Sequence, residues 1–462
     1  MGERNIAQPQ NLYTGSIFHR LVKMFRKVRS GVTLIYNKRK KIVEILISVI
    51  KNPYNLKTIS LVSQFVSEKI ELTEHLDEKL SDFLANNEYI ISISHTNYTQ
   101  NVGGVEIRIM DEQKAYNKGD IDYLHIYPIL ARHPELGNEL RYFGINCNGD
   151  GIGVTDREGL LSTLTQLHTK RLLDIFIHHT MGFDIALINQ ILEIGGRKGR
   201  FWLHDNFSIC PNYTLLRNDL IYCGAPNINS KACLTCKHGY SRRMQQPTFA
   251  KLFEDNDLEI VAPSQFALDL WIENSSYPLK TGKIIPHLKL SWNSTAPIIP
   301  INTPLRIGFI GYPVYWKGWD TWLLLANKYS DDARYQFFCF TSWDCPSTMK
   351  RVSVSVTRDN RLSMIEALKE NYIDVAFLWS LCPETFSFTL YESLAAGCYI
   401  LAYKDSGNIQ AYLKENTDHG LVLDNEQTLF DLFSGNHLYS LVANYQKIGK
   451  PLGELTFLPE FE

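Results

Sequence analysis

Residues 374–400 read DVAFLWSLCPETFSFTLYESLAAGCYI, and their pattern predicts a strand, a loop and a helix in succession. The apolar residues 374–380 predict a buried strand. Residues 382–388 contain a proline and polar side chains, and they predict the loop that leaves the carboxyl end of this strand. Residues 389–397 predict a helix that ends at Gly397. This succession is typical of α/β sheets, which bind ligands at the carboxyl ends of their strands.

Glu384 and Glu392 are the only charged side chains between residues 382 and 400, in a stretch that is otherwise largely apolar. Carboxylates are rarely buried without a partner. The predicted elements place Glu384 in the loop and Glu392 about one turn into the helix. The amides of residues 387–390 then form the helix N-terminus, which favours phosphate. Carboxylates beside a phosphate site are suited to accept hydrogen bonds from hydroxyl groups, so neither acid needs a cation. The pattern therefore predicts a ligand such as a nucleotide sugar.

Short apolar runs alternate with helix-like stretches along most of the chain, which predicts parallel sheets covered by helices. The strand candidates are residues 89–96, 172–180, 199–206, 258–265 and 283–287, followed by 305–313, 335–343, 351–358, 374–380 and 398–404. Residues 290–304 are rich in Pro, Ser, Thr and Asn and predict a linker. We expect two α/β domains, residues 86–297 and 303–462, preceded by a helical segment over residues 1–85. One arrangement to test is a last helix, within residues 430–462, that crosses back onto the first domain.

The composition is that of an ordinary globular protein, with 462 residues, 45% hydrophobic and 21% charged, and a net charge of −2. This balance gives no support for nucleic-acid binding. No signal peptide is recognised, and the most apolar early run, residues 42–50, is shorter than the roughly 20 residues that a membrane-spanning helix needs. We therefore expect a cytoplasmic protein with reduced cysteines.

A basic amphipathic helix is predicted within residues 16–51. Phe18, Leu21 and Phe25 fall on one side, and Arg20 and Lys23 fall on the other. Two interpretations remain open. The helix could lie on the inner face of an anionic membrane as a peripheral contact, or it could pack on the body of the protein with a solvated basic face.

The motif P-E-x-F-x5-E-S-L-A-A-G over residues 383–397 resembles the E-x7-E signature of retaining GT-B glycosyltransferases, in particular the GT4 group. The resemblance implies a GT-B fold, in which two Rossmann-like domains face a cleft. It implies that Glu384 faces the donor sugar and that Glu392 holds the ribose hydroxyls. Thr385 and Ser387 stand where this group often has glycine. The motif further implies donor contacts from Phe386, Ser387, Phe388, Thr389 and Leu390.

Residues 306–322 read RIGFIGYPVYWKGWDTW and resemble a second motif of the same group: a strand, a glycine, a short loop and Lys-Gly. The resemblance implies that Gly311 and Lys317 lie at the donor diphosphate. A fixed cation there stabilises the charge that the leaving group acquires in the transition state. The group usually has arginine at the position of Tyr312, so one diphosphate contact is absent or comes from elsewhere.

Residues 101–106, NVGGVE, resemble the glycine-rich loop of the first GT-B domain. The resemblance implies that Gly103 and Gly104 let the backbone approach the diphosphate and the acceptor closely. The loop does not match the G-x-G-x-x-G dinucleotide fingerprint. A histidine of this family that reaches the donor sugar corresponds to His204. His178 and His179 are second choices, because a histidine at a strand end is often only a satisfied polar group.

Four of the nine cysteines fall within the insertion 204–240, namely Cys210, Cys223, Cys233 and Cys236. Reduced thiols argue against disulfides. One C-x-x-C pair and two further cysteines match the ligands of a tetrahedral structural zinc. The alternative is four unrelated buried cysteines. A catalytic metal is not expected, because four thiolates leave no open position.

The resemblance implies transfer of a hexose or deoxyhexose from a nucleotide diphosphate sugar to a hydroxyl of a glycan or lipid-linked glycan. It implies retention of configuration and no cofactor for catalysis, as in members that assemble cell-surface polysaccharides. Two alternatives stay open. One is a GT-B-shaped epimerase or phosphorylase, and the other is a catalytically inactive scaffold of a polysaccharide-assembly complex.

Overall fold

The structure of the chain is a computed structural model that describes residues 71–132, 139–293, 303–447 and 452–457. The basic helix predicted within residues 16–51 lies outside the described residues. Within the described part of the chain, no helix is long and apolar enough to span a membrane.

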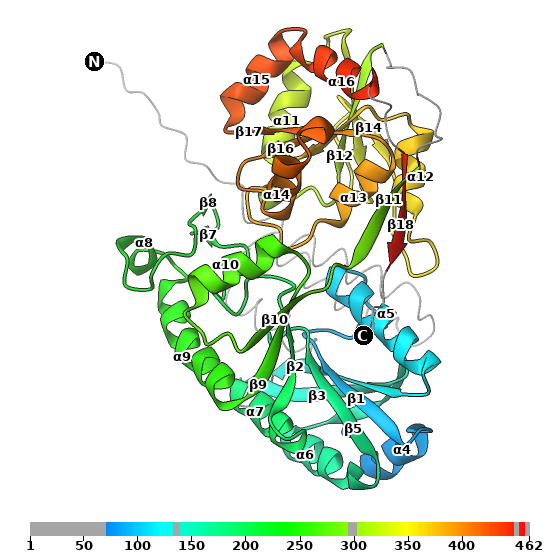
Figure 1. Cartoon of the computed structure of the whole chain (residues 1–462), viewed down its shortest axis with the longest axis vertical. Coiled ribbons are helices and arrows are strands. Elements are labelled where there is room, and N and C mark those ends of the chain that lie inside the picture. The colour runs from blue at the N-terminus through cyan, green and yellow to red at the C-terminus, as the bar shows by residue number, and fades with distance from the viewer. Residues whose placement is uncertain (1–70, 133–138, 294–302, 448–451, 458–462) are drawn as a thin grey trace, which may run out of the picture. The chain divides into compact units, whose positions relative to one another are not determined.

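The second half of the chain forms a six-stranded parallel sheet with the order β14-β13-β12-β15-β16-β17 (Figure 1). In order along the chain this is 3-2-1-4-5-6, the strand order of the Rossmann fold. Its strands are β12 (Leu305–Ile310), β13 (Tyr335–Phe340), β14 (Lys350–Val352), β15 (Val375–Leu378), β16 (Tyr399–Tyr403) and β17 (Gly420–Leu423). Parallel neighbours need helical connections, which are α11 (Trp319–Lys328), α12 (Ser363–Glu370), α13 (Phe388–Ala395) and α14 (Asn408–Glu415).

This sheet is apolar on both faces, as expected when helices cover both. On one face Trp322 of α11 packs with Phe433 of α15 (Glu426–Ser434) and Leu438 of α16 (His437–Lys447). On the other face Leu368 of α12 and Leu390 of α13 join the strand residues. Both faces are thereby removed from water, and the strand ends carry the polar side chains.

The first half of the chain forms an eight-stranded sheet with the order β10-β9-β6-β5-β1-β2-β3-β4. Six strands are parallel, and β3 and β4 add an antiparallel hairpin at one edge. The strands are β1 (Glu88–Ile93), β2 (Asp122–Arg132), β3 (Glu139–Cys147), β4 (Asp150–Thr155), β5 (Arg171–Ile177), β6 (Lys198–Trp202), β9 (Asp257–Ala262) and β10 (Thr281–Ile284). The helices are α4 (Leu76–Phe83), α5 (Gly104–Lys118), α6 (Arg157–Gln166), α7 (Ile185–Ile194), α9 (Gly239–Asp255) and α10 (Gln265–Ser275). The predicted α/β class with two Rossmann-like sheets is confirmed.

The segment between the sheets and the end of the chain pair with each other. β11 (Leu288–Asn293) runs antiparallel to β18 (Leu452–Phe457). The sequence predicts a linker from residue 290, which is wrong for residues 290–293, because Leu290 packs against the core of the second sheet. Helix α16 packs into that same sheet, and the domain boundaries 86–297 and 303–462 stay predictions.

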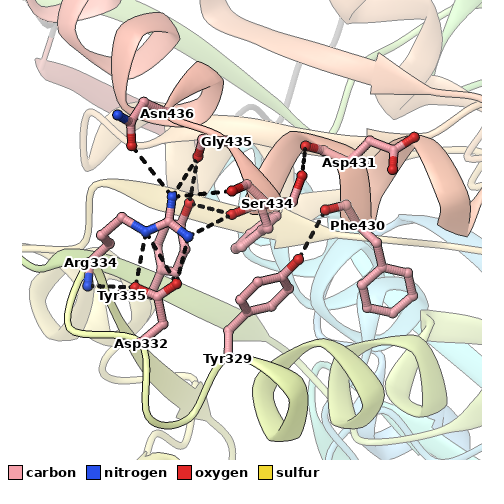
Figure 2. A network of polar contacts seen from close by, with 10 residues as sticks. Tyr329, Asp332, Arg334, Tyr335, Phe430, Asp431, Ser434, Gly435 and Asn436 are labelled. Carbon is pink, nitrogen blue, oxygen red and sulfur yellow. Dashed lines mark hydrogen bonds and ion pairs between the residues drawn. The ribbon is translucent and has the colours of Figure 1, made fainter.

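A polar network fastens the end of α15 to the second sheet (Figure 2). Arg334 donates from Nη1 to the carbonyl of Gly435 at 2.8 Å and from Nη2 to that of Phe433 at 3.3 Å. Asp332 accepts from Nη2 of Arg334 at 2.6 Å, and the hydroxyl of Tyr335 donates to the Phe433 carbonyl at 2.9 Å. The last carbonyls of a helix lack partners within it, so a cation there satisfies them and fixes the helix end.

Candidate functional site

Lys317 and Glu384 meet where the second sheet reverses its strand order. β12 lies between β13 and β15, and ligands of open α/β sheets bind at such a reversal. Lys317 ends the 3-10 turn η2 (Tyr315–Lys317) after β12, and Glu384 lies in the loop after β15. Nζ of Lys317 lies 2.5 Å from Oε1 of Glu384, and Oγ of Ser380 lies 2.8 Å from the same oxygen. Glu384 therefore has a cationic partner that the sequence pattern does not require.

The surroundings of Lys317 keep its amine charged and hold its turn in place. Burial by itself lowers the pKa of Lys317, but the Glu384 carboxylate, together with Cys382 and Tyr213, raises that pKa above its ordinary value. Gly318 has a φ of 77°, and a Cβ there would lie 2.3 Å from the carbonyl oxygen of Trp379. The glycine of the Lys-Gly pair thus lets the turn pack on the backbone beyond β15. Gly311 follows β12 with a φ of 118°, which also favours glycine.

A segment that the sequence analysis does not single out holds the backbone of Glu384. The N–H of Glu384 donates to the carbonyl of Ser406 at 3.4 Å, and its carbonyl accepts from the N–H of Asn408 at 2.8 Å. Gly407 has a φ of 67°, and a Cβ there would lie 2.5 Å from the amide nitrogen of Glu384. The D-S-G-N sequence of residues 405–408 signals a turn. The sequence of residues 405–408 does not indicate that this turn packs against residue 384.

Helix α13 begins beside Glu384, and part of its N-terminus is already engaged. Ser387 is the N-cap, and its Oγ accepts from the N–H of Leu390 at 3.3 Å. Oδ1 of Asn408 accepts from the N–H of Ser387, also at 3.3 Å. The amides of Phe388 and Thr389 have no acceptor within the helix. The amides of residues 387–390 are predicted to face phosphate. Those of Ser387 and Leu390 are used by the two bonds above, and those of Phe388 and Thr389 are not.

Glu392 is buried in α13 with 6% of its surface exposed, and its side chain has no hydrogen-bond partner among the described residues. Burial raises its pKa to about 7, and the nearby guanidinium of Arg361 opposes that rise. Nη1 of Arg361 lies 2.7 Å from Oδ1 of Asp111, while its Nε and Nη2 are buried without a partner. The sequence analysis misses Arg361, whose only signal is a cation in the loop before α12.

Three side chains, one from helix α5 and two that follow strands of the first sheet, form a buried hydrogen-bonded row, which we call the Glu112–His178–His204 row. Nε2 of His178, after β5, lies 3.0 Å from Oε2 of Glu112 in α5. Nδ1 of His178 lies 3.0 Å from Nε2 of His204, after β6. Burial raises the pKa of Glu112, but His178 and Arg108 outweigh it and lower that pKa to about 2. Burial also lowers the pKa of His204 well below its ordinary value.

His179, the other second-choice histidine, belongs to a different pair. Its Nε2 lies 3.0 Å from Oδ2 of Asp205. Burial raises the pKa of Asp205, but His179 outweighs burial and lowers it. The two adjacent histidines of the H-H-T sequence therefore have separate acidic partners, and only His178 contacts His204.

The glycine-rich loop lies next to the helix of the E-x7-E motif. Gly103 is the N-cap of α5, and Gly104 is its first residue. A Cβ on Gly104 would lie 3.2 Å from the ring of Phe388. The ring of His287 is parallel to that of Phe388 within 6°, with centroids 5.6 Å apart. The sequence analysis misses His287, although this histidine ends the predicted strand 283–287 and so carries the same strand-end signal as His178 and His204.

The loop that holds Glu384 also contacts the predicted histidine. Oγ1 of Thr385 donates to the backbone carbonyl of His204 at 2.5 Å. Oγ of Ser264 donates to the carbonyl of Thr385 at 2.7 Å. The ring of Phe386 packs edge-on against His287, with centroids 4.9 Å apart. The structure thus brings His204 together with the motif residues 385–388.

Tyr312 occupies the position where the resembled group has arginine. Its side chain is 58% exposed, and its ring lies edge-on to Trp343 with centroids 6.4 Å apart. Tyr312 supplies no cation, so the positive charge nearest to the motif glutamates comes from Lys317 and Arg361.

The clustered cysteines line one cavity, beside the strands β7 (Leu216–Arg217) and β8 (Ile221–Tyr222) and the short helix α8 (Lys231–Leu234). Four free thiols contribute to its wall, those of Cys210, Cys223, Cys233 and Cys236. Arg242 donates from Nη1 to Sγ of Cys233 at 3.1 Å. In the described ranges, no group of three or more His, Cys, Asp or Glu side chains is placed to hold a metal ion. Zinc at these cysteines stays a prediction.

No protein-family model and no curated protein matches the chain. Sucrose-phosphate synthase from Thermosynechococcus elongatus is 13% identical, with 78% of this chain and 93% of that chain covered and a TM-score of 0.45. Anabaena HepE in complex with UDP-glucose is 13% identical, with 78% of this chain and 94% of that chain covered and a TM-score of 0.46. A glycosyltransferase from Rickettsia africae is 13% identical, with 79% of this chain and 93% of that chain covered and a TM-score of 0.45. At these TM-scores the likeness assigns no activity, and the site has to be interpreted from its own residues.

Proposed function

We propose that the chain is a retaining glycosyltransferase of the GT4 type. It would move a hexose or deoxyhexose from a nucleotide diphosphate sugar to a hydroxyl of a glycan in polysaccharide assembly. The observation that carries the proposal is the contact of Lys317 with Glu384 at the strand-order reversal of the second sheet. A cation and a carboxylate at that point suit a ligand with phosphate on one side and a hydroxyl-rich sugar on the other.

Donor binding would exchange the partner of Lys317. The diphosphate takes over the ammonium group, together with the amides of Phe388 and Thr389, and Glu384 becomes free to accept from sugar hydroxyls. The bond from the anomeric carbon to the diphosphate oxygen then breaks while the acceptor oxygen bonds to that carbon on the same face. The acceptor proton passes to the leaving phosphate. Lys317 stabilises the charge that develops there, so no metal is required.

Three further side chains complete the proposed donor site. Glu392 accepts from the ribose hydroxyls, and His204 accepts from the donor sugar. Arg361 has two buried nitrogens, Nε and Nη2, without a hydrogen-bond partner, and it would supply the positive charge that Tyr312 does not. For the acceptor, a lipid-linked glycan at the inner membrane face is supported by the basic pattern of residues 16–51.

A panel of nucleotide diphosphate sugars, screened by thermal shift and saturation-transfer NMR, tests the proposal. We expect one donor to stabilise the chain, and Lys317→Gln to weaken binding of its nucleoside diphosphate about tenfold or more. Lys369→Gln, at an exposed position on α12 of the same sheet, is the matched control and should change nothing. Conversion of the donor without an acceptor would indicate an epimerase, and binding without any turnover would indicate a scaffold.

A further inference from the structure

The hydrogen bonds of the Glu112–His178–His204 row have a direction that starts at Glu112. Its side chain is buried and ion-paired with Arg108, so it is a carboxylate whose oxygens can only accept. Nε2 of His178, at 3.0 Å from Oε2 of Glu112, must therefore carry a proton. The hydroxyl of Tyr123 donates to the same oxygen at 3.1 Å. The first link of the row is thus a donation from histidine to carboxylate.

The charge balance of this cluster sets the second link. Nε of Arg108 donates to Oε1 of Glu112 at 2.9 Å, and both side chains are 2% exposed. One cation and one anion already cancel, and a charged His178 would add an uncompensated buried charge. A neutral His178 with its proton on Nε2 has an unprotonated Nδ1. That nitrogen lies 3.0 Å from Nε2 of His204, so His204 must donate to it from Nε2.

The same reasoning fixes the remaining nitrogen of His204. Burial is the main cause that disfavours a charge on this ring, and the buried cation Arg108 adds to it. A neutral ring that carries its proton on Nε2 has a lone pair on Nδ1. Among the described residues, Nδ1 of His204 has no hydrogen-bond partner. It is also not among the fully buried atoms that lack one, so it is accessible to solvent.

We propose that Glu112, acting through His178, holds His204 in the tautomer whose Nδ1 accepts a hydrogen bond from a hydroxyl of the donor sugar. Glu112 and His178 are then positioning residues, and His204 contacts the ligand. Nδ1 accepts the bond without taking the proton, because the ring resists becoming charged. A sugar that lacks the hydroxyl at this point would leave Nδ1 unpaired, so the row selects for donors that carry it. The ligand role rests on the proposed glycosyltransferase function, whereas the tautomer does not.

Nitrogen-15 NMR of histidine-labelled full-length protein tests the tautomer directly. In the unmodified chain we expect an unprotonated resonance for Nδ1 of His204 and a protonated one for Nε2, assigned by their loss in His204→Gln. Glu112→Gln should redistribute the proton between these nitrogens, because an amide can also donate to His178. Tyr123→Phe removes a different donor to the same carboxylate oxygen and should leave His204 unchanged. His125, which contacts Ser92 and the Thr96 carbonyl instead, is the internal reference.

The outcomes separate this inference from the proposed function. A protonated Nδ1 in the unmodified chain overturns the tautomer, and this spectrum decides the matter even if Glu112→Gln does not fold. With the donor identified, Glu112→Gln should weaken binding of the nucleotide sugar about tenfold and leave the nucleoside diphosphate unaffected. Equal weakening of both ligands overturns the sugar contact. If no nucleotide sugar binds while the tautomer is as expected, the proposed function fails and the tautomer stands.

Discussion

The two glutamates of the E-x7-E motif have opposite surroundings, although they stand in one short stretch. Glu384 contacts the ammonium of Lys317, whereas Glu392 is buried in α13 with its pKa raised to about 7. A buried carboxylate without a hydrogen bond resists ionisation. The sequence pattern predicts a cation partner for neither acid. The burial of Glu392 makes this residue titrate near neutral pH.

Glu392→Gln should stabilise the protein at alkaline pH. The folded pKa of Glu392 is raised from 4.5 to about 7, so its contribution to stability is fully present below pH 4.5 and is lost as the pH rises through 7. Glutamine does not ionise. We therefore expect a gain on the order of 3 kcal/mol in the free energy of unfolding above pH 8, and none below pH 4.5. Urea unfolding across this range measures it.

The control for this prediction is Glu366→Gln, at an exposed position on α12. It should show no pH-dependent gain. Equal stability of Glu392→Gln and the unmodified chain at pH 8 would mean that Glu392 is ionised there at no cost. The same variant tests the ribose assignment, because it should weaken nucleotide binding above pH 7, where the carboxylate is present to accept the hydroxyls.

At the scale of single elements, the end of α15 depends on one arginine. Arg334→Ala removes the donors to the carbonyls of Phe433 and of Gly435, the second of which is labelled in Figure 2. We expect a loss of about 1 kcal/mol in the free energy of unfolding, because helix-end carbonyls lose their partners. Arg351→Ala, which breaks an exposed pair with Asp344, is matched in exposure and should cost less. Equal losses in denaturant unfolding would show that the carbonyl contacts add nothing.

The cysteine insertion holds a buried cation beside its thiols. Burial raises the pKa of Cys210 to about 11 and outweighs this cation, which by itself lowers the pKa of Cys210 and Cys223. Arg242 is 2% exposed, and its guanidinium donates to three backbone carbonyls and to Sγ of Cys233. No carboxylate partner of Arg242 is found in the part of the chain that the structure describes. A buried cation is stabilised by a nearby anion, and thiolates held by a metal would supply one. The thiols would have to come closer together than they are here.

Metal analysis of protein purified under reducing, chelator-free conditions tests the zinc prediction. We expect one zinc per chain, lost together with thermal stability in Cys233→Ser/Cys236→Ser. Cys345→Ser changes a cysteine outside the cluster and should keep the metal. Less than one zinc per chain in the unmodified protein contradicts the prediction, and Arg242 then pairs with a thiol in a metal-free cavity.

At the scale of the whole molecule, most of the parallel strands were predictable and the hairpin was not. The predicted runs 89–96, 172–180 and 335–343 overlap β1, β5 and β13, because buried parallel strands tend to be apolar runs. The parallel strands β2 and β17 were missed, as were β3 and β4 of the hairpin. The hairpin strands mix polar and apolar side chains, since an edge hairpin buries less of its surface. The predicted strand 351–358 is only Lys350–Val352.

The candidate site was predictable where one segment carries the signal. Glu384, Glu392 and Lys317 stand in recognisable motifs next to predicted strands, and the fold places Lys317 against Glu384. Glu112 and Arg361 were missed, because each acts on a residue far away in the chain. Glu112 contacts His178, and Arg361 contacts Asp111. A single sequence shows which side chains can ionise, but not which of them share a buried pocket.

The residues 71–131 and 140–462 should unfold together, because buried polar contacts join their two sheets within one compact unit. Asp111 and Arg361 form an ion pair at 2.7 Å with 11% and 14% of their side chains exposed, and Ser264 donates to the Thr385 carbonyl at 2.7 Å. We expect one calorimetric transition for the full chain. Asp111→Asn/Ser264→Ala should split it into two, since breaking a buried pair costs about 3–5 kcal/mol.

The matched control is Asp344→Asn, which breaks an ion pair whose carboxylate is fully exposed, and it should leave a single transition. Circular dichroism and tryptophan fluorescence, recorded on the same samples, show whether both sheets report the same midpoint. Two transitions in the unmodified chain would mean that each sheet is stable without the other. A single transition in the double variant would mean that apolar packing alone joins them, and the Asp111–Arg361 pair would then serve the ligand and not the fold.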